Sequence, residues 1–305
     1  GRDFVFRGAL RRDEPLTRES YQRTQDRAKA MGVLEGVEFH EHEFRDKPHH
    51  MSRPDYMYEI SVGTDYAVSF GRDIYRAKIP LDRRRVRIII DYLNALNAPY
   101  RDGKRVYRWS VINNNCSHIA HNALAEAGIW APWPTGEFIV TAAFNFPVPK
   151  NEFVDLMVRA NDLPVDDPQA LFADAWVRRA LLEFDLLPTA PGALASAEPA
   201  IAENQIYDID GLRLIFYSSH LWGKYRQRFA RIFREPRYFF LPANLNHFAA
   251  VYERARKNLH GARGDAEKLR FMTSYEHYLG REIGRVTQQL AAISCSADEP
   301  IEAAI

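Results

Sequence analysis

The most regular pattern of hydrophobic and polar positions in the chain lies between residues 82 and 97. Apolar side chains recur there with helical spacing, at Val86, Ile89, Ile90, Leu93 and Leu96. Asp82 precedes them as an N-cap residue and Pro99 follows them, so the pattern predicts a helix over 82–97. Similar signals predict helices over 17–31, 116–127, 168–184, 246–259 and 265–293.

Shorter segments in the first half of the chain are typical of strands. They lie at 37–44, 56–62, 66–70, 72–79 and 106–112. Gly63, Thr64 and Asp65 separate two of them, which predicts a β-hairpin, and Asp102-Gly103 predicts a second tight turn. Together these segments predict a small antiparallel sheet.

The pattern of hydrophobic and polar positions changes after Pro134. Helical patterns dominate from residue 151 onward, and residues 188–200, which are rich in Pro, Ala and Ser, predict a linker or long loop. We therefore predict an α+β protein in two parts, a sheet-containing domain at 1–145 and a mostly helical accessory region at 146–305.

Charge and composition exclude several classes of function. The chain has 305 residues, and its 41 basic and 40 acidic side chains leave a net charge of +1, so nonspecific nucleic-acid binding is not expected. Apolar runs are shorter than the roughly 18 residues of a transmembrane helix, so no transmembrane segment is expected. Two cysteines cannot form a disulfide framework. The sequence leaves open the compartment, cytoplasmic or exported, and the oligomeric state.

Cys116 is the leading candidate for chemistry. Asn115 is a favoured N-cap residue and Gly128 a favoured C-cap residue, which places Cys116 in the first turn of the helix over 116–127. The unpaired N–H groups and the dipole at a helix N-terminus stabilise a thiolate, the nucleophilic form of cysteine. The alternative is structural, because Cys116 heads the apolar stripe of this helix and would then face the domain as a small hydrophobic residue.

The segment Asn115-Cys116-Ser117-His118-Ile119 resembles the Asn-Cys-Glu-His-Phe motif of lecithin:retinol acyltransferase-like proteins, in the permuted branch of the papain-like thiol hydrolases and acyltransferases. Its neighbours resemble uncharacterised bacterial members of that superfamily, in the order 65–70, Tyr75, Tyr92-Leu93 and 107–109. The resemblance covers residues 37–130. It implies a permuted papain-like domain and hydrolysis or transfer of an acyl group, on an acyl, peptide or lipid substrate and without a cofactor.

The resemblance also implies a histidine base that precedes the cysteine in the sequence. The upstream histidines, in the order in which we favour them, are His50, His49, His42 and His40. The family carries this histidine near residues 55–58, where this chain has none. A non-catalytic interaction protein that retains the fold is therefore the alternative function.

Two further roles follow from the same comparison. A polar residue would orient the imidazole, and the candidates are Glu59, Asp65 and Ser69. The backbone N–H of Cys116, with an amide from Asn114 or Asn115, would stabilise the oxyanion. The sequence does not choose between hydrolase and acyltransferase, because they differ only in which acceptor reaches the acyl-enzyme.

Two other patterns suggest different chemistry. The pairs His118 with His121 and His40 with His42 could each direct two imidazoles toward one metal ion, but no further ligand motif accompanies them, and no metal is expected. The run 222–237 is rich in aromatic and basic residues. It is typical of an amphipathic helix with solvated arginines, and the alternative is a surface for an anionic lipid headgroup or a nucleic acid.

Overall fold

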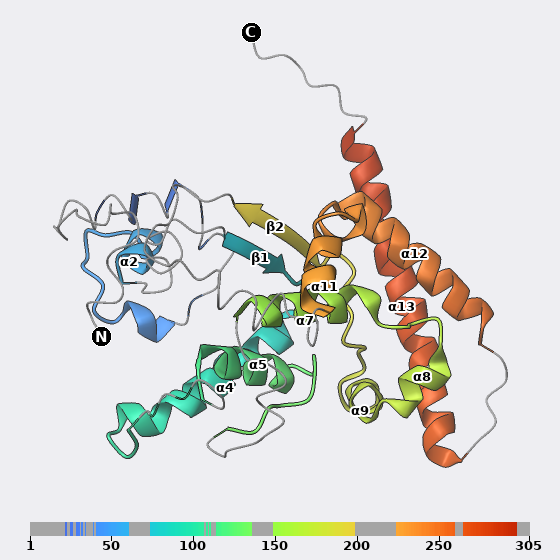
Figure 1. Ribbon diagram of the computed structural model, residues 1–305, viewed down its shortest axis with the longest axis horizontal. Coiled ribbons are helices and arrows are strands. Elements are labelled where there is room, and N and C mark those ends of the chain that lie inside the picture. Colours follow the sequence, from blue (N-terminus) through green and yellow to red (C-terminus); the bar gives the residue numbers. More distant parts are fainter. Residues whose placement is uncertain are drawn as a thin grey trace, which may run out of the picture. The chain divides into compact units, whose positions relative to one another are not determined.

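The chain forms an α+β structure that is mostly helical and contains a small antiparallel sheet (Figure 1). This computed structural model describes residues 41–60, 74–106, 114–135, 149–198, 224–259 and 265–297, positions 108 and 110, and scattered positions between 22 and 39. The predicted α+β class and small antiparallel sheet are confirmed. The predicted hairpin strand 66–70 and its turn lie outside the described residues.

Contacts between backbone positions divide the chain into two compact units. One contains residues 1–76 and 196–217, and the other contains residues 77–195 and 218–305. This division does not coincide with the one expected near residue 145 from sequence character, and that domain boundary stays a prediction.

The sheet pairs β1 (Ile74–Lys78) with β2 (Leu194–Glu198). β1 lies within the strand predicted at 72–79. β2 lies within residues 188–200, so the prediction of a linker there is wrong for the described positions, and residues 187–191 are buried. The reason is side-chain size, because Ala190 and Ala193 are small enough to pack against Ala160 of a neighbouring helix, with Ile79 beside them.

The first unit contains the short 3₁₀ helix η2 (Glu41–Phe44) and the helix α2 (Arg53–Ile60). The strands predicted at 37–44 and 56–62 are therefore wrong where the structure describes them. Ser52 supplies the physical reason, because its hydroxyl accepts a hydrogen bond from the backbone N–H of Asp55 and caps the start of α2. The described positions between 22 and 30 are helical, as predicted.

In the second unit, α4 (Arg83–Arg101) and α5 (Cys116–Glu126) pack together, and α5 also packs on α7 (Pro149–Asp162). Asp82 caps α4 as predicted, at 2.8 Å from the N–H of Arg85. Pro99 lies inside the last turn of α4 and does not end it. Gly103, at φ +69°, makes the predicted turn. The strand expected at 106–112 is reduced, in its described positions, to one bridge between Ser110 and Asn114.

The remaining helices of this unit are α8 (Pro168–Ala173), α9 (Ala175–Phe184), α11 (Lys224–Ile232), the 3₁₀ helix η3 (Pro236–Tyr238), α12 (Leu241–Lys257) and α13 (Ala266–Ala297). Of these, α8, α9, α12 and α13 line a large hydrophobic core. α12 packs along α13 (Figure 1). Buried tyrosine and phenylalanine side chains from both helices fill the core. The helix predicted over 168–184 is split at Asp174, whose carboxylate caps α9. None of the helices in the described ranges is both long enough and apolar enough to cross a membrane.

Candidate functional site

The N-terminus of α5 forms as the sequence predicts. Asn115 is extended, with φ −135° and ψ −176°, and its side-chain oxygen accepts hydrogen bonds from the N–H groups of Ser117 at 2.8 Å and His118 at 3.3 Å. A bridge between Ser110 and Asn114 fixes the chain just before the helix. Cys116 is therefore the first helical residue, and its side chain is exposed.

The buried face of α5 differs from the predicted one. Cys116 and Ala120, expected to face the domain, are exposed, whereas Ser117, His118 and His121 are buried. The two histidines are accepted inside because polar groups contact them there, Asn115 at His118 and Glu152 and Ala131 at His121. The alternative interpretation of Cys116, as a small hydrophobic residue packed in the core, is therefore wrong.

His118 lies directly behind the N-terminus of α5. Its side chain is 1% exposed, and its Nδ1 atom lies 3.3 Å from the side-chain oxygen of Asn115. An amide oxygen only accepts hydrogen bonds, so Nδ1 carries the proton in this contact. The edge of the Trp133 ring lies against the same imidazole, with the ring centres 5.2 Å apart. His118 thus fixes the cap residue from the inside.

His121 is held between two tryptophan rings. Its ring centre lies 3.8 Å from that of Trp133 and 4.4 Å from that of Trp130, and both pairs are nearly parallel. Its Nε2 atom lies 2.9 Å from the carbonyl oxygen of Ala131, and its Nδ1 atom lies 3.1 Å from a carboxylate oxygen of Glu152 on α7. Every face and both nitrogen atoms of this imidazole are therefore engaged.

The hydrogen bonds of His121 define where its protons can lie. The carbonyl oxygen of Ala131 only accepts, so Nε2 carries a proton. One further proton lies on the axis between Nδ1 and Glu152, and either group can hold it. Burial raises the pKa of the Glu152 carboxyl, while the hydrogen bond from His121 opposes this change and the charge of Asp155 adds to it. Burial thus favours the neutral form of Glu152, and the contact with His121 favours its charged form.

Backbone contacts attach the tryptophan segment to α5. Trp130 donates its indole N–H to the carbonyl of His121 at 2.8 Å. Asn122 donates from its amide to the carbonyl of Trp133 at 2.9 Å and accepts from the N–H of Trp133 at 2.7 Å. This segment is consequently fixed on the helix at three points, beside the buried face that carries His118 and His121.

The candidate bases lie in the first unit. His49 and His50 are exposed in the turn that follows η2, where Lys47 donates to the carbonyl of Met51 at 2.6 Å. Glu59 is exposed on α2. Because Cys116 belongs to the second unit, pairing of its thiol with His50 or His49 stays a prediction.

Other candidate residues lie partly or wholly outside the described positions. His40, Asp65 and Ser69 fall in undescribed segments, and His42 is described only through its backbone in η2.

His118 and His121, one of the two histidine pairs suggested as metal ligands, form hydrogen bonds within the protein. Both nitrogen atoms of His121 are hydrogen bonded, so a metal ion would have to displace Glu152 or Ala131. Among the described positions, no group of three His, Cys, Asp or Glu side chains is arranged to hold a metal ion.

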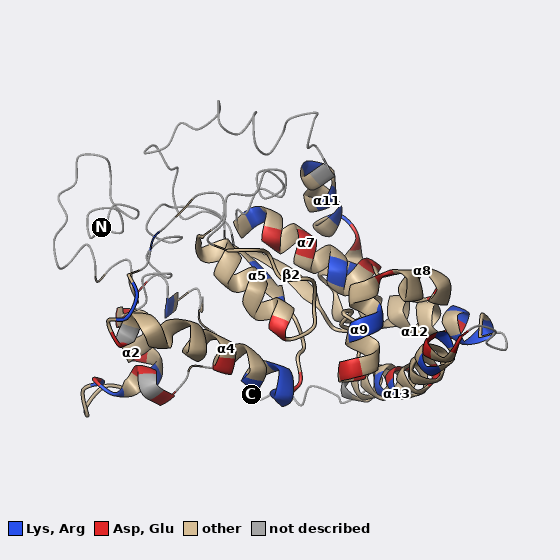
Figure 2. Ribbon diagram, turned by 90° about the horizontal axis from the view of Figure 1, so that it is seen from below, with Lys and Arg blue, Asp and Glu red and all other residues tan. Residues whose placement is uncertain are grey.

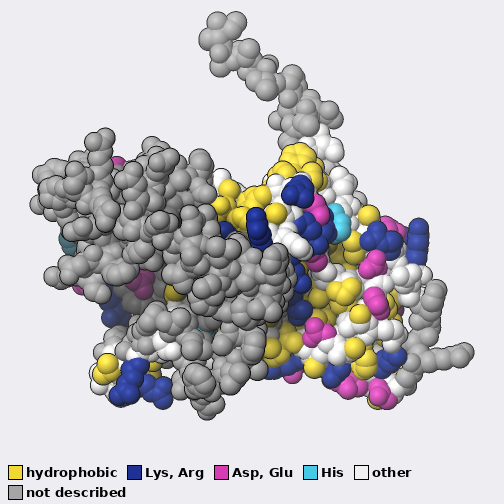
Figure 3. Space-filling model, viewed as in Figure 1, with side chains coloured by type: hydrophobic (Ala, Val, Ile, Leu, Met, Phe, Trp, Pro, Cys, Tyr) yellow, Lys and Arg dark blue, Asp and Glu magenta, His cyan; other side chains and the backbone are white. Residues whose placement is uncertain are grey.

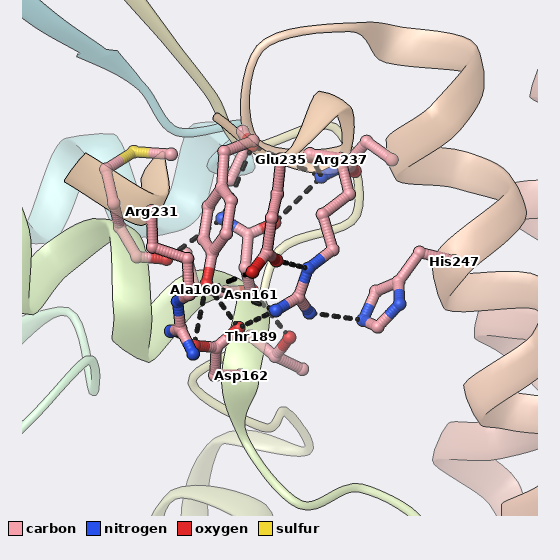
Figure 4. Close-up of polar contacts among 12 residues, drawn as sticks. Ala160, Asn161, Asp162, Thr189, Arg231, Glu235, Arg237 and His247 are labelled. Atoms are coloured by element: carbon pink, nitrogen blue, oxygen red, sulfur yellow. Dashed lines mark hydrogen bonds and ion pairs between the residues drawn. The ribbon is translucent and has the colours of Figure 1, made fainter. Parts of the chain in front are cut away.

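A second, partly buried polar cluster surrounds Asp162 at the end of α7 (Figure 4). Its carboxylate accepts from the hydroxyl of Tyr238 at 2.7 Å and forms ion pairs with Arg231 and Arg237. Glu235 holds Arg237 from the other side, with 2.9 Å between its carboxylate and Nε. Acidic positions of α7 thus lie beside basic positions of α11 (Figure 2). This cluster joins α7, α11 and η3.

His247 extends this cluster onto α12. Arg237 lies 3.0 Å from its Nε2 atom, and because a guanidinium only donates, that nitrogen is unprotonated. Burial and the charge of Arg237 lower the pKa of His247, while a hydrogen bond with the backbone of Asn161 opposes the change. The ring is therefore held in its neutral form.

The sequence predicted neither the cluster around His121 nor the cluster around Asp162. The sequence 130–134, which contains two tryptophans and two prolines, indicated only a change in character, although His121 stacks on both rings. Glu152 lies 31 residues from His121 and Asp162 lies 76 residues from Tyr238, so local spacing could not pair them. The available signal was the presence of polar residues at 118, 121 and 122 of a short helix.

Comparison of the chain with protein-family models, with curated proteins and with solved structures finds no match.

Proposed function

We propose that the chain performs cysteine-dependent acyl chemistry at Cys116, on a permuted papain-like fold. The observation that supports this proposal is the position of the thiol, which is exposed in the first turn of α5 behind the Asn115 cap. A helix N-terminus favours negative charge at that place, and an exposed sulfur can reach a substrate. The resemblance of residues 115–119 to a thiol acyltransferase motif supports the same reaction class.

In the proposed reaction the Cys116 sulfur attacks the carbonyl carbon of an amide, ester or thioester. A histidine, with His50 as the first candidate and His49 as the second, takes the thiol proton as the carbon–sulfur bond forms. The carbonyl oxygen becomes negative and is stabilised by the positive end of α5, with the N–H of Cys116 as donor. The bond to the leaving group then breaks, and the histidine returns the proton to that group.

The acyl group is then bound to sulfur and needs an acceptor. Water gives a carboxylic acid, and an amine gives an amide; either releases the free thiol of Cys116. The acceptor therefore decides between hydrolysis and transfer, and the residues of α5 act identically in both.

The two cysteines of the chain provide an internal comparison for the test. Both thiols are exposed, but Cys116 lies at the start of α5 and Cys295 lies near the end of α13, where the helix dipole disfavours negative charge. The full chain is treated with iodoacetamide at several pH values, and each site is quantified by mass spectrometry. Cys116 should react about tenfold faster or more, and its rate should persist at acidic pH.

Variants at the candidate base separate catalysis from mere exposure. His50→Ala or, for the second candidate, His49→Ala should slow the labelling of Cys116 below neutral pH, and His277→Ala, at an exposed position of α13, serves as the matched control. If Cys116 and Cys295 react at equal rates at every pH, and neither histidine variant alters them, the chain is better explained as a non-catalytic interaction protein.

A further inference from the structure

The last turn of α11, the segment that joins it to α12 and the first residue of α12 present side chains on two opposite sides. Arg231, Arg237 and Tyr238 turn inward, where all three contact the carboxylate of Asp162 (Figure 4). Tyr238 is 0% exposed, and the backbone N–H of Phe240 donates to the carbonyl of Pro236 at 2.8 Å. These contacts fix the conformation of the segment, so its outward side is a defined surface.

The outward side of this segment is mostly apolar. Phe239, Phe240 and Leu241 are consecutive in sequence and are 43%, 55% and 37% exposed. Arg234 and Pro236, just before them, are also exposed. We call these five residues the α11–α12 surface, and Figure 3 shows hydrophobic side chains beside Lys and Arg side chains over this part of the molecule. Single exposed apolar residues are ordinary, but adjacent ones on a fixed turn indicate a binding surface.

The charge next to the α11–α12 surface is positive. Glu235 is the one acidic residue in the sequence 224–252, and its carboxylate contacts Arg237 at 2.9 Å and Arg231 at 4.0 Å. Arg226 and Arg234 are exposed, and neither has an ion pair with any residue that the structure describes. The cationic groups available to a partner are therefore the guanidinium groups of Arg226 and Arg234, which have no counterion among the described residues.

We propose that the α11–α12 surface binds the surface of an anionic lipid bilayer. Phenylalanine and leucine side chains insert at the boundary between headgroups and acyl chains, where their exposed area leaves water. Arginine stems lie along that boundary while their guanidinium groups contact lipid phosphates and carboxylates. A lipid surface fits better than a nucleic acid, because Pro236 and Leu241 add aliphatic area beside the two phenylalanine rings, and aliphatic side chains contribute to insertion at a lipid boundary but not to the stacking of bases. This surface is independent of the chemistry proposed at Cys116.

Vesicle sedimentation of the full chain tests this proposal. The protein is mixed with vesicles of phosphatidylcholine alone, or of phosphatidylcholine with about one third phosphatidylserine. The variants are Phe239→Ser with Phe240→Ser, and Arg226→Gln with Arg234→Gln. Leu269→Ser on α13 is the matched control, because Leu269 is 43% exposed and lies on a different helix. Circular dichroism and size-exclusion chromatography check the folding and assembly of each protein.

The wild-type chain should bind the phosphatidylserine vesicles, and added salt should weaken this binding. The phenylalanine pair variant should lose about tenfold in partitioning, the arginine pair variant should lose the preference for anionic lipid, and Leu269→Ser should behave as wild type. Absence of wild-type binding, or unchanged binding by both pair variants, would overturn the proposal. The proposal would also be overturned if the wild type formed a dimer that the phenylalanine variant loses and did not bind vesicles. That result would identify a second copy of the chain as the partner. Should the phenylalanine variant fail to fold, the arginine variant and the salt dependence decide the question.

Discussion

Replacing His121 with alanine tests whether its stacking between Trp130 and Trp133 stabilises the fold. The change removes the imidazole that lies between Trp130 and Trp133 and leaves the Glu152 carboxyl without its hydrogen-bond partner. Stacking on each ring contributes about 0.5–1.5 kcal/mol beyond burial. Removing one partner of a buried ionic pair costs about 3–5 kcal/mol. These contributions overlap, so we expect the free energy of unfolding to fall by about 4 kcal/mol.

Urea unfolding followed by far-ultraviolet circular dichroism measures this loss, because that signal does not depend on the altered surroundings of the tryptophans. His277→Ala is the matched control, since His277 is exposed on α13, and its effect should stay within about 0.5 kcal/mol. Burial raises the pKa of Glu152, and the hydrogen bond from His121 opposes this change. In His121→Ala that hydrogen bond is absent, so the pKa of Glu152 should rise further. A carboxyl whose pKa is raised in the folded state stabilises the fold at low pH, and this contribution is lost as pH rises. The loss of unfolding free energy in His121→Ala should therefore be smaller near pH 5 than near pH 8.

A loss below about 1 kcal/mol for His121→Ala would refute the reasoning. It would mean that the stacked rings and the contact with Glu152 contribute little beyond filling space. A large loss that is identical at both pH values would assign the effect to packing and not to the stranded carboxyl.

Three further changes probe single features of the second unit. Asp174→Ala should lower the free energy of unfolding by about 1–2 kcal/mol in urea, because its carboxylate caps two N–H groups of α9; a loss near zero would contradict this. Gly128→Ala should cost about 1–2 kcal/mol in a thermal melt, because φ there is +80°; an unchanged melting temperature would show that the backbone can rearrange. Burial and the charge of Arg237 lower the pKa of His247 in the folded state. The neutral imidazole therefore stabilises the fold fully above its ordinary pKa of about 6.5, and this contribution is lost as pH falls through the lowered pKa. Thermal melts from about pH 7 to pH 5 should therefore fall more for the wild type than for His247→Gln, and parallel curves would contradict the assignment.

Helix ends were the most predictable part of this fold, because their signals are local. Asp82 and Asn115 cap their helices through bonds to N–H groups two or three residues away, and Gly128 takes the positive φ of a C-cap. The same kind of signal explains the main error in secondary structure. Tyr56 and its neighbours have a pattern that suits a strand, but the Ser52 cap begins a helix there.

The orientation of α5 could not be derived from its own sequence. Its small apolar residues suggested that Cys116 faces inward, yet the side that is buried carries His118 and His121. Burial of those rings depends on Glu152 and on Trp133, which reach them through tertiary contacts. The sequence thus predicted the position of the candidate nucleophile along the helix but not the direction in which its side chain points.

The buried segment 187–195 has a practical consequence for dividing this chain. Its content of proline and small residues is typical of a linker between independent domains, where a protease cuts readily and a truncation is usually placed. However, Thr189 and Ala190 both bond to the carbonyl of Ala160, and Asn244 of α12 accepts from the N–H of Gly192 at 2.7 Å. A fragment ending near residue 187 would expose α7 and α12 on the sides that this segment covers, and it would lose the polypeptide that ties them together. Limited proteolysis of the intact protein should accordingly spare this stretch despite its prolines and small residues.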